Sequence, residues 1–246
     1  MKFIGIIPSR YHSTRFPGKP LAMIGGKTMI FHVYHQAARA KSLSELLVAT
    51  DDERVFHVVK SFGGNAVLTS AEHRNGTERC AEALSVALGD YEGVINIQGD
   101  EPFIHPVQID WVAQSLKEGA EIATLVKRIS SIAEYKNDSV VKVVTSKKGE
   151  ALYFSRASLP FARNITEDIF KEHVFYKHIG IYGYTASVLK SIASLAPTPL
   201  EQLESLEQLR WLEHGFKIKV KETTHESHAV DTPEDLEKIL KSFPAR

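Results

Sequence analysis

Apolar segments and helical segments alternate along the first half of this chain, and this alternation constrains the fold more than any other feature. The expected strands are residues 3–7, 46–50, 65–69, 93–98 and 121–129, and the expected helices are residues 27–40, 53–62, 77–88 and 106–118. Strands that are separated by helices usually pair in parallel, with the helices covering both faces of the sheet. The sequence therefore predicts an α/β fold with a mostly parallel, doubly wound, Rossmann-like sheet.

The second half of the chain has a different pattern. Residues 140–144 and 151–155 flank Lys147-Lys148-Gly149, which is typical of a hairpin, and residues 176–184 form a further expected strand. We expect residues 140–184 to form a small antiparallel extension within a single domain of residues 1–246. Exposed edge strands pair readily with another chain, so the extension predicts a homodimer.

Three elements are expected near the C-terminus: a long helix over residues 199–214, a short strand over residues 218–221 and a final helix. Thr232 fits the N-cap of the final helix, Pro233 its first position and Asp235 the acid of a capping box. Thr77 is the expected N-cap of the helix that spans residues 77–88.

The composition excludes several classes of protein. Lys plus Arg number 30 and Asp plus Glu number 30, so the formal net charge is zero, and we expect no nucleic-acid binding through bulk charge. Cys80 is the only cysteine, which rules out a disulfide framework. No apolar run approaches the length of about 18 residues that a transmembrane helix needs, and no signal peptide is apparent. We therefore expect a cytoplasmic protein without membrane association.

The loop that follows the first strand carries an unusual concentration of positive charge. Arg10, Ser13, Arg15 and Lys19 lie between Pro8 and the next element, together with stiffening prolines and a glycine. A strand, a cationic loop and a helix in this order can bind phosphate groups, and three cations suit a triphosphate better than a single phosphate. The alternative is a solvated basic loop, which we consider less favoured for this combination of residues.

Further polar clusters end the neighbouring strands. They are residues 51–52, 75–79 and 98–102, and they are expected to meet the cationic loop in one cleft, because ligands bind beyond the carboxyl ends of parallel strands. Asp100 ends a buried strand in a tight turn, where a carboxylate that faces a polyphosphate could bind Mg²⁺. Turn chemistry alone explains Gly99-Asp100-Glu101-Pro102 about as well.

Two segments of the second half present polar groups on one face. In residues 176–184, His178, Tyr182 and Tyr184 alternate with apolar residues, so this face could hold a sugar acid or could pack against solvent or a partner. In the expected helix 199–214, the residues that share a face are Glu204, Glu207, Gln208 and Trp211, and the leucines form the core side. A solvated acidic face is the default alternative there.

Eight motifs, in order along nearly the whole chain, identify a family. They are residues 7–21, 49–52, 75–79, 96–102, 151–156, 178–184, 206–210 and 230–236. With these motifs the chain resembles the 3-deoxy-D-manno-octulosonate cytidylyltransferases, also called CMP-Kdo synthetases. The resemblance implies a Mg²⁺-dependent nucleotidyltransferase that forms CMP-sugar and pyrophosphate from CTP and an acidic octulosonate, for lipopolysaccharide biosynthesis.

The resemblance also implies roles for particular residues. Lys19, Asp100 and Asp231 would be catalytic, with Asp100 and Asp231 as the metal ligands. The CTP-binding residues would be Arg10, Ser13, Arg15, Lys19, Asn75, Gly76, Thr77 and Gln98. The sugar-binding residues would be Gln98, Arg156, His178, Tyr182, Glu207 and Gln208, with Arg156 facing the sugar carboxylate.

Two positions depart from the family pattern: Thr185 stands where an arginine is common, and Ala229 where a glycine is common. They leave open whether the sugar is the octulosonate or its amino variant. The main alternative enzyme is a related sugar-nucleotide transferase that uses another base or another acidic sugar, such as a sialic acid. A nucleotide-binding regulatory module on the same fold is the non-enzymatic alternative, and the presence of Lys19, Asp100 and Asp231 argues against it.

Overall fold

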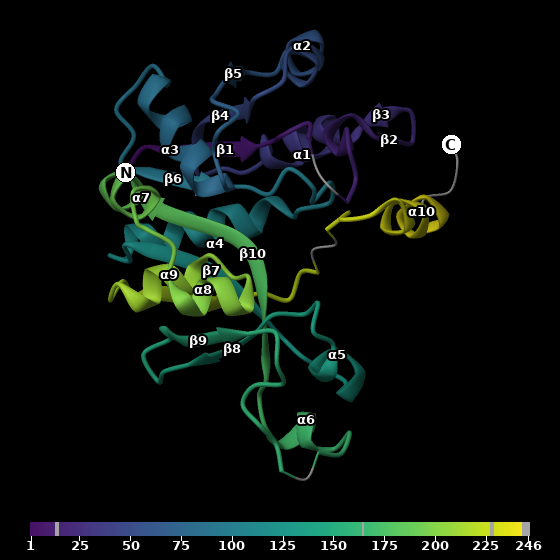
Figure 1. The fold of residues 1–246 in the computed structure, drawn as a ribbon, viewed down its shortest axis with the longest axis vertical. Helices are drawn as coiled ribbons and strands as arrows, with labels where there is room; N and C mark the ends of the chain where they lie inside the picture. The colour runs from purple at the N-terminus through teal and green to yellow at the C-terminus, as the bar shows by residue number, and fades with distance from the viewer. Residues whose placement is uncertain (13–14, 164, 227–228, 243–246) are drawn as a thin grey trace.

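The computed structural model describes residues 1–12, 15–163, 165–226 and 229–242. A nine-stranded sheet forms its centre, with the strand order β11-β7-β10-β6-β1-β4-β5; β8 pairs with β10, and β9 pairs with β8 (Figure 1). The strands of this sheet are β1 (Phe3–Pro8), β4 (Leu43–Thr50), β5 (Ala66–Leu68), β6 (Gly93–Asn96), β7 (Ile122–Arg128), β8 (Lys142–Thr145), β9 (Ala151–Ser155), β10 (Tyr176–Thr185) and β11 (Ile218–Glu222). A separate small hairpin pairs β2 (Met23–Ile24) with β3 (Lys27–Thr28).

The helices follow the strands as the alternation predicts. They are η1 (Lys19–Leu21), α1 (Met29–Ala37), α2 (Glu53–Ser61), α3 (Gly76–Val86), α4 (Pro106–Lys117), α5 (Ile132–Lys136), α6 (Ile169–Glu172), α7 (Ala186–Ala193), α8 (Pro199–Glu204), α9 (Gln208–Glu213) and α10 (Pro233–Ser242). Apolar residues of α1, α2 and α4 pack on one face of the sheet, and those of α3, α7 and α9 pack on the other. This arrangement confirms the predicted α/β fold. Within the described residues, no helix is long and apolar enough to cross a bilayer.

Strand β10 lies in the middle of the sheet, although the sequence placed it in the extension. It runs antiparallel between β6 and β7, whereas the pairs β1–β4, β1–β6, β4–β5 and β7–β11 are parallel. The reason is that the second half of this strand is buried on both faces: Ile181 and Tyr184 are fully buried, and they belong to the cores on opposite sides of the sheet. The antiparallel extension therefore consists of β8, β9 and the segments around α5 and α6, which project from the sheet in Figure 1.

The expected helix over residues 199–214 is two short helices. Ser205 adopts a left-handed backbone conformation with φ of 53°, which ends α8 and changes the direction of the chain before α9. The predicted division into faces is correct for Leu206 and Leu209, which are buried, but wrong for Leu203, which is 82% exposed, and for Trp211, which is 1% exposed. Two smaller boundaries also differ: Asn75, not Thr77, caps α3, and Lys27 belongs to β3 rather than to a helix.

The N-terminus of α10 has the predicted capping box. The Thr232 amide donates to Asp235 Oδ2 at 3.2 Å, and the Asp235 amide donates to Thr232 Oγ1 at 3.3 Å. Val230 and Ile239, on either side of this turn, are buried against Ile24 and Met29 of the β2–β3 and α1 segment. This packing fixes the last helix, and with it Asp231, beside the loop that follows β1.

Candidate active site

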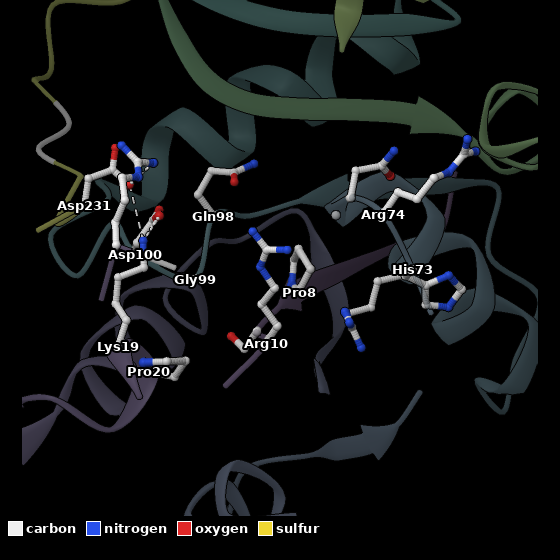
Figure 2. A pocket seen from close by; sticks show the side chains of 15 residues that line it. Pro8, Arg10, Lys19, Pro20, His73, Arg74, Gln98, Gly99, Asp100 and Asp231 are labelled. Carbon is white, nitrogen blue, oxygen red and sulfur yellow. Dashed lines mark hydrogen bonds and ion pairs between the residues drawn. The ribbon is translucent and has the colours of Figure 1, made fainter. Parts of the chain in front are cut away.

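A cavity of about 360 Å³ opens where β1 and β6 end (Figure 2). It is lined by Pro8, Ser9, Arg10, Arg15, Lys19, Pro20, His73, Arg74, Asn75, Gly76, Arg79, Gln98, Gly99, Asp100 and Asp231. We call it the basic cavity, since five of these residues are Arg or Lys. The cationic loop and the clusters 75–79 and 98–102 therefore converge, as the sequence predicts. The third cluster does not line the cavity: Asp51 pairs with Arg79, and Asp52 caps α2.

The turn after β6 fits tightly against the loop after β1. A Cβ atom at Gly99 would lie 2.6 Å from Ser9 Oγ and 2.9 Å from the Pro8 carbonyl oxygen, so a larger residue has no room there. Because Gly99 allows this approach, Gln98 and Asp100 on either side of it face the same cavity as Arg10. The Gly99-Asp100 turn is thus a packed part of the site and not only a connection between elements.

Asp100 and Asp231 lie together at one end of the basic cavity, although 131 positions separate them in the chain (231 minus 100). Lys19 Nζ is 2.6 Å from Asp100 Oδ2 and 3.4 Å from Asp231 Oδ1, and Arg15 Nη2 is 3.0 Å from the same Asp231 oxygen. The Val230 amide also donates to the Asp100 carbonyl oxygen at 2.9 Å, which holds the two backbone segments side by side.

This carboxylate pair has the chemistry of a partial metal site. Hard divalent cations such as Mg²⁺ bind one or two carboxylates and take further oxygens from phosphates and water. Over the ranges that the structure describes, no cluster of three or more His, Cys, Asp or Glu side chains is arranged to hold a metal. The residues present therefore fit a cation that a bound polyphosphate shares, rather than one enclosed by protein.

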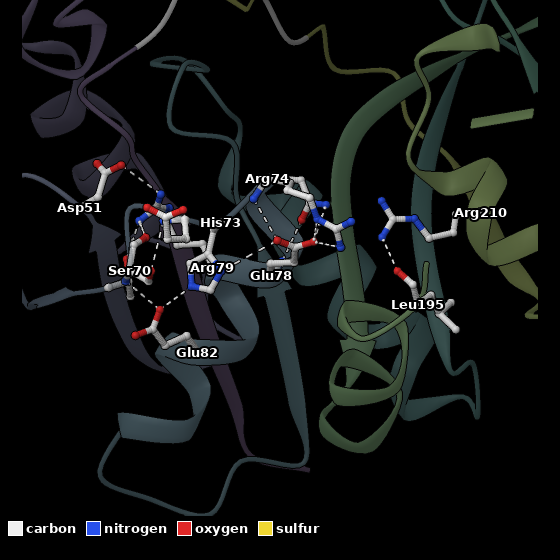
Figure 3. Close-up of polar contacts among 12 residues, drawn as sticks. Asp51, Ser70, His73, Arg74, Glu78, Arg79, Glu82, Leu195 and Arg210 are labelled. Carbon is white, nitrogen blue, oxygen red and sulfur yellow. Dashed lines mark hydrogen bonds and ion pairs between the residues drawn. The ribbon is translucent and has the colours of Figure 1, made fainter. Parts of the chain in front are cut away.

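The other end of the basic cavity contains His73, Arg74 and Arg79, which sequence reasoning did not assign a role (Figure 3). Arg79 is almost fully buried, and its guanidinium donates to Thr69 Oγ1 at 2.6 Å and contacts Asp51 Oδ2 at 3.2 Å. Arg74 and Arg79 flank or end the motif 75–79, which was the only signal for them in the sequence. Thr69 and Asp51 fix the Arg79 guanidinium at the cavity wall.

The first turn of α3 adds backbone donors to the same wall. Asn75 Oδ1 accepts a hydrogen bond from the Glu78 amide at 2.9 Å, and Asn75 and Gly76 both line the cavity. The amides at a helix start lack partners within the helix and favour anions or polar acceptors. Thr77, in contrast, is 1% exposed and lies behind the cavity surface.

A second cavity of about 580 Å³ adjoins the first. Its lining residues are Gln98, Asp100, Glu101, Ser139, Val140, Val141, Arg156, Lys177, His178, Ile179, Gly180, Glu226, Ala229 and Asp231. We call it the adjoining cavity. It shares Gln98, Asp100 and Asp231 with the basic cavity, so the two carboxylates stand where the cavities meet.

Arg156 and His178 supply different chemistry to the adjoining cavity. The Arg156 guanidinium donates to the carbonyl oxygens of Glu204 at 3.0 Å and Asp138 at 3.3 Å. Burial lowers the pKa of the His178 imidazole to about 3, so His178 is neutral at physiological pH. Since the Thr124 hydroxyl donates to the Ile181 carbonyl oxygen at 2.7 Å, it accepts from His178 Nε2 at 2.9 Å, which leaves Nδ1 as the acceptor of the ring.

Three expected sugar-binding residues lie behind the cavity walls. Tyr182 is 7% exposed, and its ring centroid is 5.2 Å from that of His178 and 5.0 Å from that of Trp211. Tyr182 lies inside the sheet, opposite Asn96 of β6 and, after a register shift in the β10–β7 pairing, opposite Thr124 of β7. Glu207 and Gln208 begin α9 behind this ring, and burial raises the pKa of the Glu207 carboxyl to about 7. Ser13 lies outside the described residues.

The fold and these two joined cavities define a nucleotidyltransferase, and comparison with known proteins agrees. The family model for cytidylyltransferases matches residues 4–222. The 3-deoxy-manno-octulosonate cytidylyltransferases of Bacteroides thetaiotaomicron and Parabacteroides distasonis are each 52% identical over 98% of this chain, and the matches cover 99% and 97% of those proteins. The chain therefore belongs to the 3-deoxy-manno-octulosonate cytidylyltransferase family.

A solved structure supports the same assignment. The CMP:2-keto-3-deoxy-manno-octonic acid synthetase, solved in complex with CTP, is 40% identical and superimposes with a TM-score of 0.91, covering 98% of both chains. Because the match covers nearly the whole chain, it includes the extension as well as the central sheet.

Proposed function

We propose that this protein transfers the cytidylyl group of CTP to 3-deoxy-manno-octulosonate and releases pyrophosphate, as a step of lipopolysaccharide biosynthesis. The anomeric hydroxyl of the sugar attacks the α-phosphorus of CTP, and the bond to the leaving pyrophosphate breaks. The observation that carries this proposal is the meeting of two cavities at Asp100 and Asp231, since a bisubstrate transfer needs its two substrates in contact at one point.

The basic cavity is the proposed CTP site. Arg10, Arg15 and Lys19 face the space in which a triphosphate would lie, and Asn75 and Gly76 offer the start of α3 to the nucleoside. Lys19 would transfer its contacts from the carboxylates to the phosphates and stabilise the charge that develops on pyrophosphate. Ser13 belongs to the same loop and remains part of the proposal.

Mg²⁺ is the proposed cofactor, held by Asp100 and Asp231. Once bound there, it would neutralise phosphate charge and lower the pKa of the attacking hydroxyl. The contribution of the protein is the placement of both carboxylates at the junction, which the packing of Val230 and the hydrogen bond from its amide maintain.

The adjoining cavity is the proposed sugar site. Arg156 would pair with the sugar carboxylate, and the neutral His178 would accept a hydrogen bond from a sugar hydroxyl. Gln98 lines both cavities and can contact either substrate. Tyr182, Glu207 and Gln208 support this wall from behind.

The sugar could also be an amino variant of the octulosonate or another acidic sugar. Only one of the two unusual positions bears on this choice: Ala229 lines the adjoining cavity, whereas the Thr185 hydroxyl accepts from the Val188 amide at the start of α7. Any difference in sugar preference is therefore expected to come from Ala229.

The test is pyrophosphate release by the purified protein with Mg²⁺. Turnover is expected with CTP and 3-deoxy-manno-octulosonate, and little with UTP or ATP or with a sialic acid. Omission of Mg²⁺ or addition of a chelator should stop the reaction. Turnover with a sialic acid but none with the octulosonate would overturn the assignment of the sugar, and release without any sugar would overturn the transfer reaction.

A further inference from the structure

Lys142 is a fully buried lysine, and over the described residues its ammonium group donates hydrogen bonds to three backbone carbonyl oxygens. Its Nζ donates to the carbonyl oxygens of Asn137 at 2.7 Å, Val140 at 2.6 Å and Arg156 at 2.5 Å, and the side chain is 0% exposed. An ammonium group has three N–H donors, so all three are used. Charged donors make stronger hydrogen bonds than neutral ones, which makes this a firm three-way connection.

The three carbonyls belong to two segments that form one wall of the adjoining cavity. Asn137 and Val140 precede β8, and Arg156 follows β9; residues 139–141 and Arg156 line the cavity. Lys142 itself pairs with Ser155 across the β8–β9 hairpin and with Lys177 across β8–β10. Its side chain therefore joins the segments at the point where the extension leaves the central sheet.

Arg156 depends on this connection at both its backbone and its side chain. Its carbonyl oxygen accepts from Lys142, while its amide donates to Glu204 Oε2 at 2.9 Å. Its guanidinium donates to the carbonyl oxygen of Asp138. The residue before Asp138 is Asn137, whose carbonyl oxygen accepts a hydrogen bond from Lys142. Without the ammonium group, the Arg156 carbonyl oxygen would lose its hydrogen bond from Lys142. The segment that carries Asp138, an acceptor of the Arg156 guanidinium, would lose its connection to Lys142 at the same time.

We propose that Lys142 is a positioning residue for the acidic sugar, acting through Arg156. The inference rests on the proposed function, in which Arg156 pairs with the sugar carboxylate. It predicts that Lys142 affects use of the sugar and not of CTP, because the connection lies on the wall of the adjoining cavity and away from the basic cavity. Small displacements of a positioning group are costly because the transfer depends on orientation.

The experiment compares Lys142→Met, Arg156→Gln and the double variant in steady-state assays with each substrate varied. Lys142→Met is expected to raise the KM for the sugar about tenfold or more, the effect of losing a charged hydrogen bond, with the KM for CTP within about twofold of wild type. The double variant should be little worse than Arg156→Gln alone, since Lys142 acts through Arg156. Lys147→Met, at an exposed position of the same hairpin, is the matched control and should behave as wild type.

The outcomes separate this inference from the function on which it rests. If Arg156→Gln leaves the sugar KM unchanged, the assignment of the adjoining cavity to the sugar is wrong. If Arg156→Gln raises it but Lys142→Met does not, or if the two effects multiply in the double variant, Lys142 has no positioning role. Should Lys142→Met fail to fold, two milder variants replace it. Lys142→Gln keeps a neutral N–H donor but not the charge, and Lys142→Arg keeps the charge but cannot direct its N–H groups as an ammonium does. Both should show the same selective rise in the KM for the sugar.

Discussion

Asp231 has two features that call for different experiments. It lies two residues before Pro233, the first residue of α10, where an acid favours the helix, and it faces Asp100 across the Lys19 ammonium. The first role contributes only to stability, whereas the second belongs to the chemistry. The neighbouring Asp235 allows the two to be separated, since it supplies the capping box but lines neither cavity.

Asp231→Asn is expected to reduce turnover by about a hundredfold or more while the protein stays folded, because the amide keeps the shape and loses the charge that a cation needs. Asp235→Asn is expected to cost about 1 kcal/mol in the free energy of unfolding and to keep near-normal turnover. Turnover against Mg²⁺ concentration and urea unfolding measure both effects. If Asp231→Asn kept ordinary turnover and ordinary metal dependence, Asp231 would stabilise the start of α10 but would not bind the metal.

Glu207 predicts an unusual pH dependence of stability. Burial raises its pKa to about 7 in the folded protein from an ordinary value of 4.5, with Thr77 and Arg210 opposing that effect. The folded state therefore binds more protons than the unfolded state between these pH values, so this contribution to stability is present below pH 4.5 and is lost as the pH rises through 7. Glu207→Gln cannot ionise and escapes this loss.

The free energy of unfolding of Glu207→Gln, relative to wild type, should accordingly increase between pH 5 and pH 8. Urea denaturation at the two pH values measures it, and Glu237→Gln, at an exposed position of α10, serves as the control that should show no such increase. Equal pH dependence in the two variants would mean that Glu207 is ionised normally in the folded protein.

At the level of elements, the sequence predicted those features that depend on the local pattern of apolar and polar residues. The strands before the central cleft are continuous apolar runs, and polar residues follow each of them, so both the parallel sheet and the location of the basic cavity were predictable. The central position of β10 was not predictable. Its residues Lys177 and His178 line a cavity, and their polar side chains give the strand the sequence pattern of a half-exposed edge strand. Ser205 carries no signal for a left-handed conformation, and Glu226 reaches the adjoining cavity only through tertiary packing.

Two glycines of β10 provide a test of its central position. A Cβ atom at Gly183 would lie 2.5 Å from Val112 Cγ1 in α4, whereas at Gly180 the nearest atom would be 3.6 Å away. Gly183→Ala is therefore expected to lower the free energy of unfolding by about 1–3 kcal/mol, the usual cost of overpacking, and Gly180→Ala to change it little. Chemical denaturation compares them; similar stabilities would argue against close packing of β10 on α4.

At the level of the whole molecule, the extension leaves large apolar side chains uncovered. Leu152 on β9 is 61% exposed, and Phe161, between β9 and α6, is 82% exposed. Exposed apolar residues that gather in one region are typical of association surfaces. We therefore retain the homodimer as a prediction, formed through the extension.

Sedimentation velocity at micromolar concentration should give the mass of a dimer. Leu152→Glu is expected to shift the protein towards monomer, because it would place a charge in an apolar contact. Leu88→Glu is the matched control: Leu88 is 94% exposed but follows α3, away from the extension, and should leave the dimer intact. A monomeric wild type, or equal effects of the two variants, would contradict this prediction.

The central position of β10 also bears on inhibitor design. One end of this strand lines the adjoining cavity, and its other end is hydrogen-bonded to β6, which leads directly to Gln98 and Asp100 of the basic cavity. Both cavities are thus built on one continuous sheet. A single molecule that joins a cytidine nucleotide mimic to an acidic sugar mimic can use a short, stiff linker, and its second half then binds at a high effective concentration. The rigidity that aligns two substrates for transfer would equally favour a ligand that imitates both.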